Sequence, residues 1–158
     1  MAFSTDDDVM QLWLSDRSAA ATRFAQSYLL SHPATGNTVT GAMRTLAASG
    51  LAAAYAGARA ADFYGVTQGD PRHPDVVGIV QHGVVYTGGE SKIAEHGGND
   101  PQDRDVPVVS GGGVAAGIVN NTPLETTEIA PSILDLLGLD PHALQAVQME
   151  HTPVLPGI

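Results

Sequence analysis

The sequence contains no cysteine, so disulfide bonds and thiolate metal sites are excluded within it. Aromatic residues are also scarce, at 5% of the chain. No run of residues is long and apolar enough to span a bilayer, and three aspartates at positions 6–8 stand where a signal peptide needs basic and then apolar residues. We therefore expect neither a membrane anchor nor an export signal in this sequence.

Basic residues are few: 7 Lys and Arg stand against 17 Asp and Glu, which gives a formal net charge of −10. Proteins bind nucleic-acid polymers and anionic membranes largely through Lys and Arg, so neither is an expected partner. A phosphate ester would also be repelled, unless bound metal cations reversed the local field.

The 158 residues suffice for one domain with a hydrophobic core, and 43% hydrophobic residues are ordinary for a globular protein. In the first part of the chain, an apolar run predicts a short strand over residues 9–14. Ala-rich segments predict helices over residues 18–31 and 41–60. We therefore expect residues 1–69 to be mainly helical.

Beyond residue 69 the pattern changes. The unbroken apolar run at residues 76–80 is typical of a strand buried on both faces, and residues 106–109 and 117–119 are further strand candidates. A helix is predicted over residues 126–137, with Gly138 as its left-handed stop. Asp140 before Pro141 indicates the start of another short helix. The predicted fold class is mixed α/β, with the sheet after residue 70 and flanking helices.

The candidate for chemistry is His96, which precedes two glycines on a loop between predicted strands. Glycine lets the backbone approach a metal ion or a phosphate closely, and a neutral imidazole suits zinc. An ordinary turn residue has the same local pattern, so these residues alone leave both interpretations open.

A wider resemblance favours the metal interpretation. The sequence Lys-Ile-Ala-Glu-His-Gly-Gly at residues 92–98, followed by Asp-Arg-Asp-Val-Pro-Val-Val at residues 103–109, resembles a late segment of the alkaline phosphatase superfamily, in its type I phosphodiesterase/nucleotide pyrophosphatase branch. Residues 70–75, 126–141 and 150–157 are similar to further segments of that branch, in the same order. The resemblance therefore divides the chain into a weakly matched helical segment, 1–69, and the C-terminal block of an alkaline-phosphatase-like domain, 70–158.

The resemblance implies a hydrolase of phosphate esters with a Thr or Ser nucleophile and two metal ions, usually zinc. His96 matches a metal ligand of that pattern, and it is the one site residue that carries over. The family's nucleophile and its Asp-His-Gly ligand motif have no counterpart here, because no histidine in this sequence follows an aspartate. A catalytic zinc needs about three protein ligands, so we expect the isolated chain to be catalytically silent, with its phosphate-ester substrate bound only by the complete enzyme.

Two alternatives remain open from the sequence. The sequence also fits a non-catalytic α/β module, derived from such an enzyme and used for interaction or structure. It also fits a fragment of the sulfatase or phosphonate hydrolase branch, because the late segments are shared loosely across the superfamily.

Overall fold

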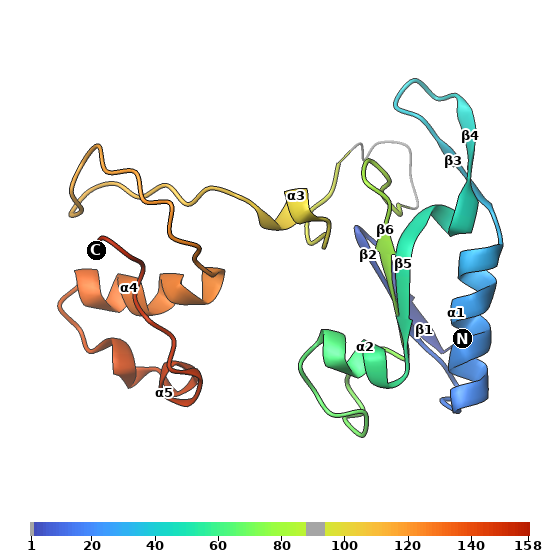
Figure 1. Cartoon of the computed structure of the whole chain (residues 1–158), viewed down its shortest axis with the longest axis horizontal. Helices are drawn as coiled ribbons and strands as arrows, with labels where there is room; N and C mark the ends of the chain where they lie inside the picture. The colour runs from blue at the N-terminus through green and yellow to red at the C-terminus, as the bar shows by residue number, and fades with distance from the viewer. Residues whose placement is uncertain (1, 88–93) are drawn as a thin grey trace. The chain divides into compact units, whose positions relative to one another are not determined.

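The computed structural model describes residues 2–87 and 94–158, and its contacts divide the chain into two units, Met1–Val106 and Pro107–Ile158 (Figure 1). We call them unit 1 and unit 2. The predicted mixed α/β class is confirmed, with helices beside a mostly antiparallel sheet. None of the described helices is both long and apolar enough to cross a membrane.

Unit 1 is built on a four-stranded sheet in the order β1-β2-β6-β5, in which every neighbouring pair is antiparallel. The strands are β1 (Phe3–Thr5), β2 (Val9–Trp13), β5 (Leu51–Ala56) and β6 (Val76–Val80). Three of the four strands precede residue 70, so the expectations of a sheet after that residue and of a mainly helical N-terminal part are wrong. The β5–β6 pair also joins the two sides of the division expected at residues 69 and 70.

The predicted second helix, over residues 41–60, is replaced by strands. The segment forms β4 (Met43–Leu46), a 3-10 turn (Ala47–Gly50) and β5, and β4 pairs with β3 (Ala34–Asn37) in a separate two-stranded sheet. Helix propensity is weak enough for tertiary contacts to override it, and β5 pairs along its length with the Val-rich β6, with one bulge between Leu51 and Ala53. Gly50, at φ +77°, turns the chain into β5.

Strand β6 is buried at all five positions, as its apolar run predicted. One face of β6 packs in a cluster with Met10, Leu51 and Ala54. Helix α1 (Ala19–Ser31) packs against this cluster through Ala25 and Leu29. The other face packs Val77 and Ile79 against Ala60 of α2 (Ala58–Phe63). The sheet of unit 1 thus lies between one helix on each face, which is the arrangement that an all-apolar strand requires.

The predicted helix over residues 18–31 is confirmed as α1, whose N-cap is Ser18. The hydroxyl of Ser18 accepts a hydrogen bond from the backbone N–H of Ala21 at 3.2 Å. A four-residue helix, α3 (Pro101–Arg104), comes late in unit 1.

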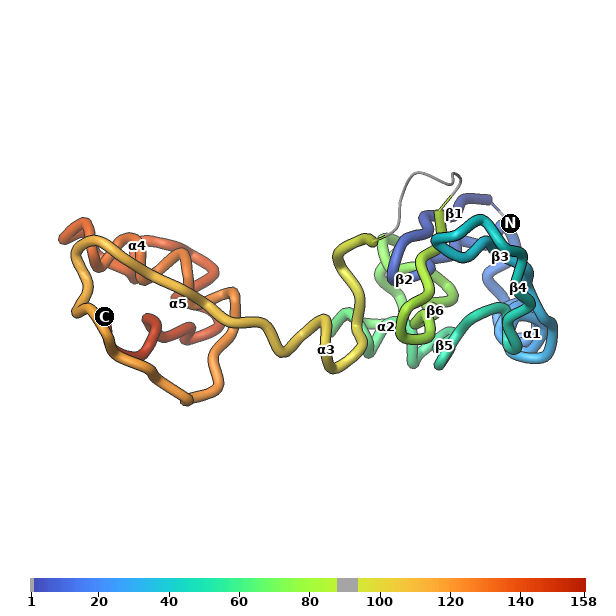
Figure 2. The backbone as a smooth tube through the Cα atoms, turned by 90° about the horizontal axis from the view of Figure 1, so that it is seen from above, coloured from blue at the N-terminus to red at the C-terminus, as the bar shows by residue number. Residues whose placement is uncertain are grey.

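Unit 2 contains α4 (Ile129–Leu136) after a 3-10 turn (Thr126–Glu128), then a second 3-10 turn (Pro141–Ala143) and α5 (Gln145–Glu150). The helix predicted before Gly138 is confirmed, and Gly138 has the expected positive φ (+68°). Asp140 is confirmed as a cap, because its side chain accepts from His142 N–H. Figure 2 follows the long irregular stretch that leads to α4.

The strands predicted at residues 106–109 and 117–119 are wrong, because neither stretch forms a strand. Pro107 lacks an N–H, and unit 2 offers no neighbouring strand for either segment to pair with. Without a ladder, an apolar run does not become a strand.

Candidate functional site

His96 lies in the described part of its loop, whereas residues 88–93, which include the first two residues of the family-like segment 92–98, lie outside the described residues. Its imidazole is 95% exposed, and Nε2 lies 3.6 Å from Oε1 of Glu95, whose side chain is buried. Gly97 follows at φ +87°, a left-handed conformation that suits glycine. The imidazole is therefore accessible to solvent beside one carboxylate.

The loop of His96 runs directly into α3. Asp100 caps that helix by accepting from Gln102 N–H at 3.0 Å, and the Asp103 carboxylate accepts from Asp100 N–H at 3.0 Å. A Cβ on Gly98 would overlap the Asp103 carboxylate and would lie 3.2 Å from Cβ of Asp8. A side chain at position 98 would therefore displace the Asp103 carboxylate, which accepts from Asp100 N–H.

The second His-Gly pair is His82-Gly83, at the turn after β6, where Gly83 has φ +76°. Nδ1 of His82 lies 3.9 Å from Oδ1 of Asp100, a contact that becomes an ion pair when the ring is protonated. The turn of His82 therefore lies against the cap of α3.

These groups do not make a zinc site by themselves. Among residues 2–87 and 94–158, no three His, Asp or Glu side chains are arranged to hold a metal ion. A catalytic zinc takes about three protein ligands, so the described residues do not fit the expected ion. The assignment of His96 as a ligand stays a prediction that requires ligands from elsewhere.

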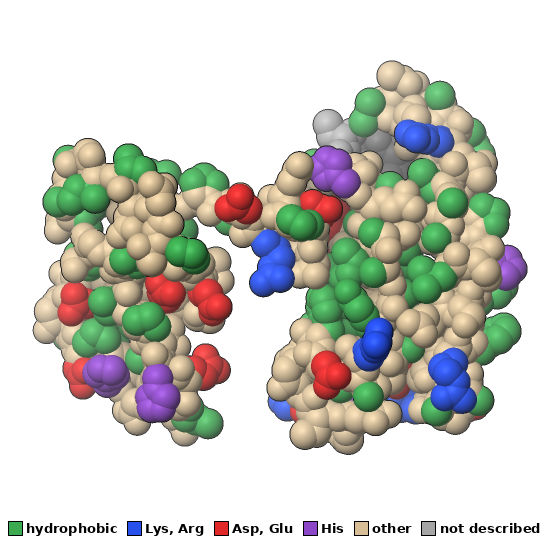
Figure 3. All heavy atoms as spheres, viewed as in Figure 1, with side chains coloured by type: hydrophobic (Ala, Val, Ile, Leu, Met, Phe, Trp, Pro, Cys, Tyr) green, Lys and Arg blue, Asp and Glu red, His purple; other side chains and the backbone are tan. Residues whose placement is uncertain are grey.

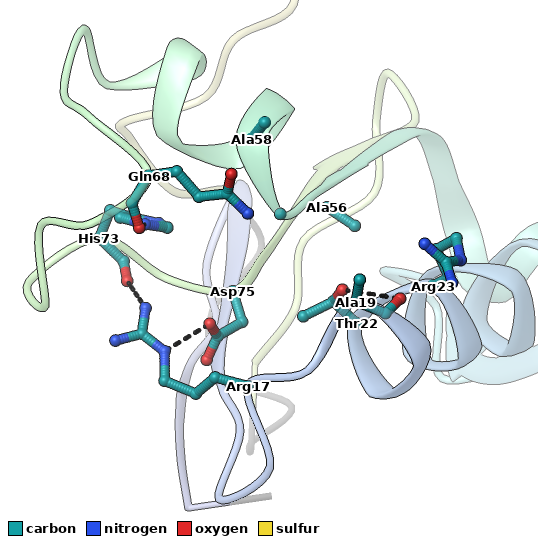
Figure 4. Close-up of a pocket in the computed structure, with 10 residues that line it drawn as sticks. Arg17, Ala19, Thr22, Arg23, Ala56, Ala58, Gln68, His73 and Asp75 are labelled. Atoms are coloured by element: carbon teal, nitrogen blue, oxygen red, sulfur yellow. Dashed lines mark hydrogen bonds and ion pairs between the residues drawn. The ribbon is translucent and has the colours of Figure 1, made fainter.

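A different group of polar side chains, which sequence reasoning missed, converges at the start of β6. Asp75 is 3% exposed, and its carboxylate accepts from Arg17 Nε at 2.6 Å and from the backbone N–H of Leu14 at 2.8 Å. Arg17 Nη2 also donates to the carbonyl of His73 at 3.3 Å. Figure 4 shows the Arg17 guanidinium between Asp75 and His73. A carboxylate directly before an all-apolar strand was the available signal, because a buried acid requires a partner.

His73 is buried in the turn that precedes β6. Its ring nitrogens contact two carbonyl oxygens: Nδ1 lies 2.7 Å from Pro74 O, and Nε2 lies 3.1 Å from Gln68 O. The imidazole thus holds together the turn that carries Asp75.

A cavity of about 510 Å³ opens beside this group. Three segments of unit 1 line it: the beginning of α1, the β5–α2 junction at residues 56–58, and the turn at residues 68–75. Arg17 and Arg23 are its basic lining residues, and Thr22 and Gln68 add a hydroxyl and an amide.

Two carboxyl groups near this region have shifted pKa values. Hydrogen bonds from the Arg72 side chain, with the Arg72 backbone N–H, hold the pKa of Asp70 well below its usual range. The backbone N–H of Ser18 lowers the pKa of Asp16 in the turn before α1. Both carboxylates favour their charged forms because donors surround them.

No protein-family model matches the chain, and no curated protein or solved structure is similar enough to it to indicate a relative.

Proposed function

We propose that residues 70–158 are the C-terminal portion of a metal-dependent phosphate-ester hydrolase, of the type I phosphodiesterase/nucleotide pyrophosphatase kind. In this proposal His96 supplies one ligand to a two-metal site, usually zinc, whose other ligands and Thr or Ser nucleophile lie outside this sequence. The observation that carries the proposal is the order of the five family-like segments around His96.

The geometry of the loop supports this role. A ligand completed by another segment must present an accessible imidazole, and that of His96 is almost fully exposed. Glycines at positions 97 and 98 add no side chain on the C-terminal side of His96. The neighbouring Glu95 carboxylate can orient the ring, as carboxylates do for many histidines that bind metals.

One histidine cannot hold a zinc ion at useful affinity. Without bound cations, a chain of net charge −10 also repels a phosphate ester. We therefore expect the isolated chain neither to bind zinc at useful affinity nor to hydrolyse a phosphate ester.

The test combines zinc titration calorimetry with turnover of a generic phosphodiester, for the chain and for His96→Ala. His142→Ala, which removes an exposed histidine of unit 2, is the matched control. We expect no turnover above background by the chain and no stoichiometric zinc uptake at micromolar protein. Turnover by the isolated chain that His96→Ala abolishes would contradict the claim that the other ligands are missing.

The positive form of the test joins the chain to a preceding segment that carries the nucleophile and the Asp-His-Gly motif. In such a protein His96→Ala should release one zinc per molecule, measured by metal analysis, whereas His142→Ala should retain both. Retention of both ions by His96→Ala would overturn the assignment of His96.

A second candidate, a non-catalytic α/β module, is favoured by one observation. Unit 1 has its own sheet with a buried core on both faces, so it has the parts of an independently folding domain. Such a module should unfold cooperatively, stay monomeric in size-exclusion chromatography and ignore chelators. A hydrolase fragment should instead associate through the apolar surface that its missing portion covers.

A further inference from the structure

We propose that the cavity beside Arg17 and Arg23 binds a small molecule through an oxyanion group, either a carboxylate or a phosphate. This inference is independent of the proposed hydrolase, because it concerns a cavity within unit 1 whose walls lie mostly outside the family-like segments. It rests on the size of the cavity, on the charged side chains that line it and on the N–H donors of Arg17 that remain available to a ligand.

The size of the cavity suits a small organic molecule. Its volume of about 510 Å³ falls within the range of roughly 300–1,000 Å³ that is common for ligand sites. Gly57 lies on its wall at φ +58°, and a Cβ there would point at Gln68 Nε2 and Thr22 Oγ1, 3.8 and 3.9 Å away. The absence of a side chain at Gly57 therefore leaves the space between these two polar groups open.

The accessible charge in the cavity is positive. Among the described residues that line it, Asp75 is the one acidic residue, and its carboxylate is buried against Arg17 and Leu14 N–H. The Arg17 side chain is 40% exposed, and Arg23 is exposed. The Asp75 charge is thus already paired with Arg17, and both arginine side chains are accessible to solvent.

The guanidinium of Arg17 is held in a fixed orientation, and some of its N–H donors remain available. Asp75 accepts from its Nε and the His73 carbonyl from its Nη2, which fixes the plane of the guanidinium (Figure 4). A guanidinium has five N–H donors in a fixed fork, so these two bonds leave donors available to a ligand. An arginine held in place in this way binds an oxyanion at a small cost in side-chain entropy.

Arg23, in α1, supplies the second positive charge to the cavity wall, and Figure 4 shows it on the same helix as Thr22. Guanidinium groups and an amide are hydrogen-bond donors of the kind from which a carboxylate or a phosphate accepts. The apolar remainder of the wall, which includes Ala19, Ala56 and Ala58, suits a small organic body attached to that group.

The test measures binding to the full chain by amide chemical-shift changes and calorimetry. The probes are inorganic phosphate, phenyl phosphate and benzoate, with benzamide as the neutral analogue of benzoate. We expect the anions to bind, with shift changes at residues 17–23 and 56–58, and benzamide not to bind. Tighter binding of phenyl phosphate would assign the site to phosphate, and tighter binding of benzoate would assign it to carboxylate.

Arg23→Gln should weaken anion binding about tenfold, the usual effect of losing one charged hydrogen-bond donor. Arg44→Gln, which removes an equal charge from exposed β4, is the matched control and should bind as the unaltered chain does. A second variant, Ala58→Glu, places a carboxylate on the cavity wall at the start of α2 and should abolish binding. Arg17 is left unchanged, because its loss would leave Asp75 buried without its counter-ion.

Three outcomes would overturn the proposal. They are no binding of any of the three anions at millimolar concentration, equal binding of benzoate and benzamide, and equal effects of Arg23→Gln and Arg44→Gln.

Discussion

Units 1 and 2 use their apolar residues in opposite ways. Unit 1 buries a strand on both faces and packs a helix against each. Unit 2 has only four buried residues, Pro131, Ser132, Val147 and Leu155, although α4 is rich in Ile and Leu. Ile133 in α4 and Leu137 at its C-cap are both exposed.

The two units also differ in charge. All seven Lys and Arg residues precede residue 107, whereas residues 107–158 carry five acidic residues and no basic one. Figure 3 shows acidic and histidine side chains on the visible face of unit 2. The basic side chains are therefore confined to unit 1.

The difference in burial follows from strand pairing. In unit 1 the apolar residues lie on paired strands and form a core, whereas in unit 2, whose described residues form no paired strands, many apolar side chains are exposed.

The largest expected effect distinguishes the two units by their cores. Leu51→Ala, at a residue buried in unit 1, should lower the free energy of unfolding by about 3 kcal/mol. Leu137→Ala in unit 2, at a residue 67% exposed, should change it by less than about 0.5 kcal/mol. Urea unfolding monitored by the fluorescence of Trp13, the single tryptophan and part of β2, measures the effect in unit 1, and far-ultraviolet circular dichroism, to which α4 contributes, measures the effect in unit 2. Equal losses would show that α4 packs as firmly as the sheet does.

The next effect concerns the buried charge of unit 1. Asp75→Asn keeps the shape of the side chain but removes the partner of Arg17, and should lower the free energy of unfolding by about 2 kcal/mol. The matched control is Asp62→Asn on the exposed side of α2, which removes the same charge. If the two variants unfold at the same urea concentration, the ion pair adds nothing to the stability of unit 1.

A smaller effect tests whether a hydrogen bond to α4 orders the C-terminal segment of unit 2. Ser132 Oγ donates to Glu128 O at 2.6 Å and accepts from Leu155 N–H at 2.7 Å, which ties the C-terminal segment to α4. Ser132→Ala should cost about 1 kcal/mol locally, because the Leu155 N–H loses its acceptor. Amide hydrogen exchange at Leu155 should become faster, while exchange in β6 stays unchanged. Unchanged exchange at Leu155 would show that this bond does not order the tail.

The smallest effect is a pH dependence that belongs to unit 1. Hydrogen bonds from Arg72 lower the pKa of Asp70 in the folded state, so the folded protein binds its proton less readily than the unfolded chain does. The resulting stabilisation is present above the unfolded pKa, about 4, and is lost as the pH falls below it. Asp70→Asn should flatten the acid side of the stability curve slightly.

Asp135→Asn, on the exposed surface of α4, is the control for this pH dependence. Urea titrations from about pH 6 to about pH 3 would compare the two variants. A larger change for Asp135→Asn would place the acid-sensitive carboxylate in unit 2 instead.

The sequence predicted elements well where the signal is local. Helix α1 begins at its Ser18 cap, α4 ends before Gly138, and β6 is the apolar run before residue 81. Each depends on a cap, a positive φ or an unbroken run of apolar residues, all of which are written in adjacent residues. The errors at residues 41–60, 106–109 and 117–119 concern pairing partners, which lie far away in the sequence or are absent among the residues that the structure describes.

The same division holds for the candidate sites. His96 was found from the sequence because its glycines adjoin it, and whether it binds a metal stays a prediction. The group of Arg17, His73 and Asp75 was not found, because 58 residues separate the two ends of its ion pair.

The sequence by itself determined the charge of the chain, the absence of thiol chemistry, the caps and stops of its helices and the buried character of β6. These properties follow from composition or from adjacent residues, so no folding is needed to read them. Only the tertiary structure decided that the Ala-rich residues 51–56 form a strand, that Asp75 is neutralised by Arg17, and that a cavity lined by two arginines lies beside them. Each depends on segments far apart in the chain, and the free energy of burying them together outweighs the weak local preference of each.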